Sequence, residues 1–457
     1  MNRVRKRAWI MLVFMMILTC GMGFFIYEYA THSAQWVVHK GSPHVYENSS
    51  VGTGVIYDRD GLLLMDTTDG RVYSQDAFLR QATLHWMGDR QGNIRANVLS
   101  KYVAELTGFD LLNGVYAYAE ANGEAELTLS GRVQKAALKA LNGRKGTVAV
   151  YNYKTGQILC AVSTPTYDPD NVPNIAGDTS GIYEGVYMNR FTQVSYPPGS
   201  IFKILTTAAA LDSVEGITEM QFTCEGKYQL SGGRVTCERA HGTQNLKSAM
   251  ANSCNCAYAQ IALLIGGETL GKYVEQFGVT KEMSFDGIYA VDGNFELESD
   301  SQAALAWSAI GQHTDLINPC AWMTFMGAIA GGGTGAVPYL MERITLADEI
   351  TYQAETCMGE RIMSEDLAKT LTEYMRNNVM QIYGDGNFPG LTVCAKSGTS
   401  ELGGGKVPNA MFSGFVTDEN YPLAFIVVVE NGGYGAHTCV PILSAVLAEC
   451  RAVLDGK

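Results

Sequence analysis

The sequence predicts an α+β protein with a single membrane helix, a small N-terminal module and a larger domain. Three observations lead to this class. Basic residues at the start precede a long uncharged apolar run, strand-like segments stand at both ends of the region after residue 145, and helix-like segments fill the stretch between them. Strands separated in this way by a block of helices are typical of one sheet packed against helices, which brings the two ends of the domain together.

The first 29 residues are predicted to form a short tail followed by a membrane anchor. Four basic residues stand within the first seven positions, and residues 8–27 contain no charged side chain. About 20 apolar residues span a bilayer, and flanking positive charges keep an N-terminus in the cytoplasm. We expect a cytoplasmic tail over residues 1–7, an uncleaved anchor over residues 8–29, and the rest of the chain outside. The alternative, a cleaved signal peptide, needs a shorter apolar region and a small-x-small cleavage site.

The charge balance argues against one class of partner. The chain has 457 residues with a formal net charge of −13, and no basic run follows the first seven positions. Nucleic-acid binding needs clustered lysine and arginine, so we expect no nucleic-acid partner.

The cysteines indicate no metal site by their spacing. Eleven are present, with no C-x-x-C pair and no histidine at a spacing typical of zinc sites, so we expect neither a metal nor another cofactor. Cys224 and Cys237 flank a polar, glycine-containing segment that is predicted to be a hairpin. An exported domain permits a disulfide between them, and two reduced thiols are the alternative.

Residues 30–145 are expected to form the small first module. A hairpin turns at Asp60-Gly61 between two short apolar segments. Residues 75–106 have a mixed pattern of apolar and polar residues and are expected to be partly helical. Residues 124–129 are predicted to be a strand, and residues 132–141 have the apolar spacing of a helix.

Residues 146–457 are expected to form the larger domain. Two strands joined by a tight turn open it, and a long irregular segment, residues 164–196, follows. A loop of this length in a compact domain is usually functional. Strands are expected over 147–151, 157–162, 392–400, 410–416 and 423–430, and helices over 201–211, 246–265, 270–277, 302–310, 319–330, 365–379 and 441–454.

Three short motifs stand out in the larger domain. Ser200 and Lys203 follow a Pro-Pro-Gly turn at an expected helix start, where free backbone N–H groups and the helix dipole stabilise negative charge. Ser253-Cys254-Asn255 interrupts an apolar helical stretch, and Lys396-Ser397-Gly398-Thr399 lies on an expected strand. An isolated Ser-x-x-Lys is more often an N-cap serine near a solvated lysine than a nucleophile beside its base. Three motifs in this order, each on the element that its chemistry needs, favour the catalytic interpretation.

The three motifs resemble those of the penicillin-binding proteins and serine β-lactamases. The surrounding sequence is similar to the class B penicillin-binding proteins in particular. Residues 146–150, 155–159 and 164–169 resemble the opening of their transpeptidase domain, residues 189–190 and 196–200 the approach to their nucleophile, and residues 56–61 their N-terminal module. The resemblance covers most of the chain after residue 50. It implies a penicillin-binding transpeptidase domain, with an antiparallel sheet flanked by helices, behind a pedestal-like module.

The resemblance implies a peptidoglycan D,D-transpeptidase that cross-links stem peptides ending in D-Ala-D-Ala. Ser200 is then the acylated nucleophile and Lys203 its base, kept neutral by burial or by the nearby cation of Lys396. Ser253 and Lys396 carry the proton to the departing D-Ala. Asn255 holds the base and the substrate amide in position.

The third motif and the nucleophile supply the remaining contacts in this family. The backbone N–H groups of Ser200 and Thr399 are expected to bind the oxyanion, and Ser397, Gly398 and Thr399 the substrate and its carboxylate. β-Lactam antibiotics are expected to acylate the same serine. Since residues 30–145 are too few for a glycosyltransferase domain, a separate polytopic glycosyltransferase of the bacterial cytoplasmic membrane is an expected partner.

Other functions stay open at this stage. A D,D-carboxypeptidase differs only in transferring the acyl group to water, and a serine β-lactamase hydrolyses its β-lactam ester. A class A β-lactamase needs Glu-x-x-Leu-Asn soon after the second motif, whereas Glu373 to Asn377 lies far downstream with Arg376 in place of leucine. The alternative of another class is a non-catalytic cell-wall scaffold or a β-lactam receptor. Division, elongation and sporulation roles are equally compatible with the sequence.

Overall fold

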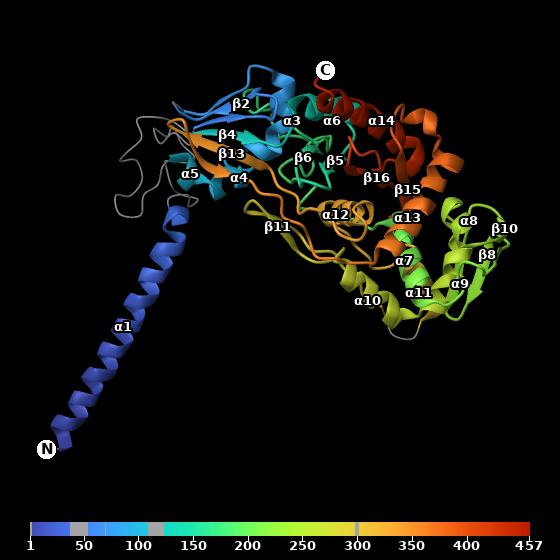
Figure 1. Ribbon diagram of the computed structural model, residues 1–457, viewed down its shortest axis with the longest axis horizontal. Coiled ribbons are helices and arrows are strands. Elements are labelled where there is room, and N and C mark those ends of the chain that lie inside the picture. The colour runs from blue at the N-terminus through green and yellow to red at the C-terminus, as the bar shows by residue number, and fades with distance from the viewer. Residues whose placement is uncertain (1, 37–53, 69, 108–122, 298–300) are drawn as a thin grey trace.

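The computed structural model describes residues 2–36, 54–68, 70–107, 123–297 and 301–457. Figure 1 shows one long helix, α1 (Asn2–Trp36), standing away from a body of sheets and helices. Residues Arg3–Ser33 form a candidate membrane span with a mean hydropathy of 2.3, and its most apolar window is 0% buried. The helix extends beyond the expected end of the anchor at residue 29. Residues 37–53 and 108–122 of the expected first module lie outside the described residues.

The sheet of the larger domain, called the larger sheet after that domain, has five antiparallel strands in the order β15-β16-β17-β5-β6. It unites the two ends of the larger domain, because β17 pairs with β5 and places Val427 opposite Val148. Every residue of β16 and β17 is buried, so both faces of the sheet are covered. The strands are β5 (Gly146–Asn152), β6 (Ile158–Thr164), β15 (Val393–Ser400), β16 (Asn409–Val416) and β17 (Leu423–Val429).

Helices cover the two faces of this sheet. α6 (Gly131–Leu141) and α14 (Gly435–Leu454) pack on one face, and α12 (Pro319–Ala330) packs on the other. α14 is long and apolar enough to span a membrane, but its packing against the sheet makes it a core helix. α14 begins six residues before the expected start at Pro441. Pro441 removes one hydrogen bond within the helix, but the buried residues around it keep the helix packed against the sheet.

The stretch between these strands folds into a helical block. α7 (Lys203–Ser213) runs through it, and every residue from Lys203 to Ala210 is buried. Packed near α7 are α8 (Leu246–Ala251), α9 (Asn255–Ile265), α10 (Gly267–Phe277), α11 (Gln302–Ser308) and α13 (Glu365–Asn378). Short strands lie beside α9, namely β7 (Phe222–Cys224), β8 (Lys227–Leu230), β9 (Gly233–Thr236) and β10 (Gly242–Gln244). β8 and β9 form the hairpin that was expected between Cys224 and Cys237.

The second sheet has six strands in the order β14-β13-β4-β1-β2-β3. Four of them come from the first module, while the hairpin of β13 and β14 comes from the region assigned to the larger domain. β13 pairs antiparallel with β4 and places Ile344 opposite Ala125. The strands are β1 (Val55–Tyr57), β2 (Leu63–Asp66), β3 (Val72–Tyr73), β4 (Glu124–Leu127), β13 (Met341–Leu346) and β14 (Glu349–Gln353).

Smaller elements complete the fold. α3 (Ala77–Met87), α4 (Asn97–Lys101) and α5 (Val103–Thr107) fall within the segment expected to be partly helical. The hairpin of β11 (Met283–Phe285) and β12 (Ile288–Ala290) was not anticipated. The α+β class and the sheet flanked by helices are confirmed.

Candidate active site

Two glycines build the turn that carries Ser200. Gly199 has a φ of +54°, and a Cβ there would lie 2.6 Å from the carbonyl oxygen of Thr399, so a larger residue would push the two segments apart. The Gly199 N–H donates to Gly311 O at 2.7 Å, and a Cβ on Gly311 would lie 2.2 Å from Gly199 O. A short 3-10 turn, η1 (Gly199–Ile201), leads directly into α7. The structure therefore places Ser200 at the entrance of a helix, where sequence analysis expected it.

Lys203 lies one helical turn after Ser200 and is fully buried. Its Nζ is 3.0 Å from Ser200 Oγ, 2.7 Å from Ser253 O and 2.7 Å from Asn255 Oδ1. The Nζ also lies 5.4 Å from the centre of the Tyr258 ring. These contacts hold a potential base within hydrogen-bond reach of the hydroxyl that it would deprotonate.

Ser253 connects this lysine to the third motif. It stands at the break between α8 and α9 with a φ of +51°. Its Oγ is 3.2 Å from Lys203 Nζ and 3.0 Å from Lys396 Nζ. Four groups thus form one line of contacts from Ser200 Oγ to Lys396 Nζ, with steps of 3.0, 3.2 and 3.0 Å. Such a line can move a proton between an attacking hydroxyl and a leaving group.

Burial sets the charge of the two lysines. It lowers the pKa of Lys203 to about 8, because the ammonium form loses its hydration. Burial also lowers the pKa of Lys396 well below its usual value, and the positive charge of Lys203 lowers it further. Of the two causes anticipated for Lys203, desolvation is the leading one. Placing two buried ammonium groups side by side is unfavourable, so one of the two lysines readily loses its proton.

The third motif lies on β15, which is an edge strand of the larger sheet. A Cβ on Gly398 would lie 2.9 Å from Pro198 O and 3.0 Å from Ile201 Cγ2, so the strand runs directly against the turn that carries Ser200. Ser397 and Thr399 flank this glycine and are half-buried. An edge strand in this position can accept an extended peptide beside the nucleophile.

Tyr383 belongs to the site but was not anticipated. It ends a π-helical turn, η2 (Val379–Tyr383), that follows α13, and it is buried. Its hydroxyl accepts the Ser397 N–H at 2.9 Å and lies 2.9 Å from Ser397 Oγ. Tyr383 therefore orients the Ser397 hydroxyl. No sequence signal marks it, because a π turn differs from an ordinary helix only by one inserted residue.

Two further predictions concern residues outside the line of contacts from Ser200 to Lys396. Glu373 is exposed on α13, so the structure gives it no buried position from which to activate a water molecule. Cys224 and Cys237 are both free thiols, so the disulfide considered between them is not formed.

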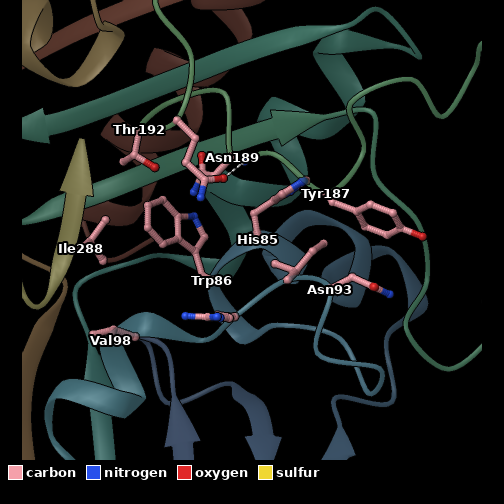
Figure 2. A pocket seen from close by; sticks show the side chains of 11 residues that line it. His85, Trp86, Asn93, Val98, Tyr187, Asn189, Thr192 and Ile288 are labelled. Carbon is pink, nitrogen blue, oxygen red and sulfur yellow. Dashed lines mark hydrogen bonds between the residues drawn. The ribbon is translucent and has the colours of Figure 1, made fainter. Parts of the chain in front are cut away.

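A separate pocket lies between α3 and the long irregular segment that precedes Ser200 (Figure 2). Its lining includes His85, Trp86, Asn189 and Ile288 and contains no residue of the three motifs. The His85 Nε2 is 2.9 Å from Val186 O, and burial lowers the His85 pKa to about 4. The imidazole is therefore neutral at pH 7, and its contact fastens the irregular segment to α3.

Comparison with known proteins identifies the family. The family model described as "Penicillin binding protein transpeptidase domain" matches residues 146–448. Peptidoglycan D,D-transpeptidase PbpA of Mycobacterium tuberculosis is 30% identical to this chain over 369 residues, which cover 73% of each protein. Stage V sporulation protein D of Bacillus subtilis is 26% identical over 430 residues, covering 88% of this chain and 62% of that protein.

Solved structures share the fold. The crystal structure of PBPA from Mycobacterium tuberculosis has a TM-score of 0.75 at 26% identity, covering 88% of this chain and 99% of that one. The D,D-transpeptidase domain from Eggerthella lenta has a TM-score of 0.76 at 25% identity, covering 89% and 99%. The sequence match spans well over half of the chain, and the three motifs meet around one serine within the matching fold. On these grounds the chain belongs to the penicillin-binding protein transpeptidase family.

Proposed function

We propose that the protein is a peptidoglycan D,D-transpeptidase that forms an acyl-enzyme on Ser200. The observation that carries this proposal is the line of contacts from Ser200 through Lys203 and Ser253 to Lys396. The relative PbpA is named a peptidoglycan D,D-transpeptidase, and a similar solved structure, 25% identical with a TM-score of 0.71, is a penicillin G acyl-enzyme complex covering 87% of this chain and 99% of that one. The substrate is a stem peptide that ends in D-Ala-D-Ala.

In the acylation step, Ser200 Oγ attacks the carbonyl carbon of the penultimate D-Ala while neutral Lys203 takes the hydroxyl proton. The 3.0 Å separation of the two groups supports this assignment. The contact of Asn255 Oδ1 with the same Nζ holds the base in place. The negative charge that develops on the carbonyl oxygen needs backbone donors, and the Ser200 and Thr399 N–H groups come from two segments that touch at Gly199.

The C–N bond to the terminal D-Ala then breaks. The Ser253 hydroxyl donates a proton to the departing amine and is reprotonated by Lys203, which holds the proton taken from Ser200 and whose Nζ lies 3.2 Å away. Lys396, with its Nζ 3.0 Å from the same hydroxyl, orients Ser253 for this transfer. The amine of a second stem peptide attacks the ester carbon, its proton returns along the same line, and Ser200 is regenerated. Ser397 and Thr399 lie on the edge strand beside the Ser200 turn, and their hydroxyls suit the terminal carboxylate of the first peptide.

The proposed location is the outer face of the bacterial cytoplasmic membrane, with α1 as a single-pass anchor and the N-terminus inside. The basic residues before the apolar run support this orientation. We also infer a polytopic glycosyltransferase as a membrane partner. The apolar side chains of α1 are exposed on all sides, Phe14 and Phe24 at 66% each, and offer a surface to a second membrane protein. Purification from membranes that repeatedly yields no such protein would contradict this inference.

Labelling of the full-length protein with a fluorescent penicillin tests the proposed function. The wild type should form a stable adduct, Ser200→Ala should form none, and a peptide map should place the adduct on Ser200. A Ser248→Ala variant is the matched control, because this exposed serine lies on neighbouring α8 without contact to the two lysines.

The release rate of the label separates the alternatives. Slow release supports a penicillin-binding transpeptidase, whereas rapid release to hydrolysed penicillin supports a serine β-lactamase. Absence of any adduct on Ser200 in a folded protein would leave a non-catalytic scaffold.

A further inference from the structure

Four side chains that are typical metal ligands meet beside the second motif. They are Cys224 at the end of β7, Cys237 just after β9, His241 just before β10, and Cys254 at the N-terminus of α9. Their ligand atoms all lie within 4.8 Å of one another. In Figure 1 these elements form a small unit of short strands against α9, on the side of the body far from the membrane helix.

The distances within the group fit a tetrahedral zinc ion. Zinc–sulfur bonds of about 2.3 Å in a tetrahedron place two sulfurs about 3.8 Å apart. Cys237 Sγ is 3.7 Å from Cys254 Sγ, and Cys224 Sγ is 3.5 Å from His241 Nδ1. The separation of the two sulfurs exceeds the length of about 2.05 Å that a disulfide needs. Three thiols and one imidazole are a ligand set that structural zinc sites use.

The surroundings of the sulfurs suit thiolates. The Cys256 N–H donates to Cys237 Sγ at 3.3 Å, and the Ala257 N–H donates to Cys254 Sγ at 3.4 Å. The second of these bonds caps α9, whose positive N-terminal end stabilises the charge of a thiolate. Such N–H donors around ligand sulfurs are the contacts that hold metal ligands in position.

The geometry points to a structural zinc site, and we propose that Cys224, Cys237, His241 and Cys254 bind one Zn²⁺. Neither the proposed reaction nor the comparisons assign this function to the four residues. The spacing of the four residues in the sequence does not indicate a metal site. Three residues separate Cys237 from His241, and twelve separate each outer cysteine from its neighbour in the set. No metal was expected, because the chain has no C-x-x-C pair. Only the fold brings the three segments together.

The site would position the catalytic motif. Cys254 lies between Ser253 and Asn255, so a metal bound to its sulfur anchors the backbone on which both side chains depend. Ser253 has a φ of +51°, a conformation that a serine adopts only when its surroundings hold it there. Asn255 is held on the same side, because its Nδ2 donates to Thr236 O at 2.9 Å, one residue before Cys237. The zinc would thus tie the β8–β9 hairpin to the turn that orients Lys203 and its partners.

Metal analysis of the full-length protein tests the proposal. The protein is purified in detergent under reducing conditions with no polyhistidine tag and no chelator, and its metals are measured by mass spectrometry. We expect about one zinc ion per chain in the wild type. His241→Ala and Cys237→Ser should lose most of the zinc, and His241→Cys should keep it because four thiolates also bind zinc. Cys357→Ser is the matched control, since that cysteine is exposed and outside the group.

Two further measurements keep a negative result interpretable. Exchange of the wild-type metal for Co²⁺ should produce thiolate-to-cobalt charge-transfer bands and the d–d bands of a tetrahedral site, which requires no variant to fold. Ser200→Ala should bind zinc like the wild type, so failure of the proposed reaction would not be mistaken for failure of this site. Zinc well below one per chain and unchanged by His241→Ala, or a disulfide between any two of the three cysteines in the isolated protein, would overturn the proposal.

Discussion

Replacement of Ser253 by alanine removes one atom from the middle of the proposed proton path. The Oγ lies 3.2 Å from Lys203 Nζ and 3.0 Å from Lys396 Nζ, so the two lysines lose the group that joins them. The backbone at this position should persist, because alanine and serine bear a similar cost at a φ of +51°. Lys203 also keeps its contacts with Ser253 O and Asn255 Oδ1. The base therefore stays beside Ser200, and the loss falls on proton delivery to the leaving group.

The expected size of the effect follows from these contacts. General acid–base catalysis by one positioned group contributes about 10²- to 10⁴-fold, which is about 2.7–5.5 kcal/mol in activation free energy. The rate constant for penicillin acylation of Ser253→Ala should fall by this factor. Thermal stability should change little, because the serine is half-buried and its loss opens no large cavity.

The assay is stopped-flow or quenched labelling with a fluorescent penicillin over a range of concentrations, which gives kcat/KM-type acylation constants. Ser248→Ala, on the neighbouring helix, should react like the wild type. If folded Ser253→Ala acylates within about threefold of the wild type, the hydroxyl is not the proton donor and the proposed path is wrong.

Three other outcomes follow from buried groups and close contacts. Acylation should become faster as the pH rises through about 8, since only the deprotonated form of Lys203 can act as base and its pKa is about 8; equal rates at pH 6 and pH 8.5 would contradict this. Gly311→Ala should lower both the thermal midpoint and the acylation constant, because its Cβ would lie 2.2 Å from Gly199 O at a φ of +75°; a crystal structure with an unmoved nucleophile turn would refute the reasoning. Asp315 is buried and its pKa is raised to about 9, so the folded state keeps a proton that the unfolded state loses above about pH 4, and wild-type stability should fall as the pH rises through this window. Asp315→Asn should therefore be more stable than the wild type by an amount that grows from pH 5 to pH 8, and a constant difference in thermal midpoint would argue against a buried neutral acid.

The catalytic motifs were predictable because their residues are closely spaced and each motif is tied to one local element. The helix start at Ser200, the break at Ser253 and the strand of Lys396 can each be recognised from a few neighbouring residues. Their meeting point follows from the family resemblance, and the structure adds the contact distances. The strands of the larger sheet were found for the same reason, since each is an apolar run bounded by turns.

Features that depend on distant contacts were not predictable. The β13–β14 hairpin joins the sheet of the first module across more than 200 residues, and nothing in its own sequence names that partner. Tyr383 contacts Ser397 from the end of a π turn, 14 residues earlier in the chain. The four proposed zinc ligands come from three segments whose spacing follows no common motif. In each case, the tertiary structure supplies a neighbour that local sequence does not specify.

The fate of the acyl group on Ser200 is the most direct test of the proposed reaction. Purified full-length protein would be incubated with glycan strands that carry D-Ala-D-Ala stem peptides, and the muropeptides released by digestion would be analysed by mass spectrometry. Cross-linked dimers together with stoichiometric free D-Ala, both absent with Ser200→Ala, are the predicted result. Free D-Ala without dimers would identify a carboxypeptidase, and release of neither product by a folded protein that binds penicillin would contradict a catalytic role.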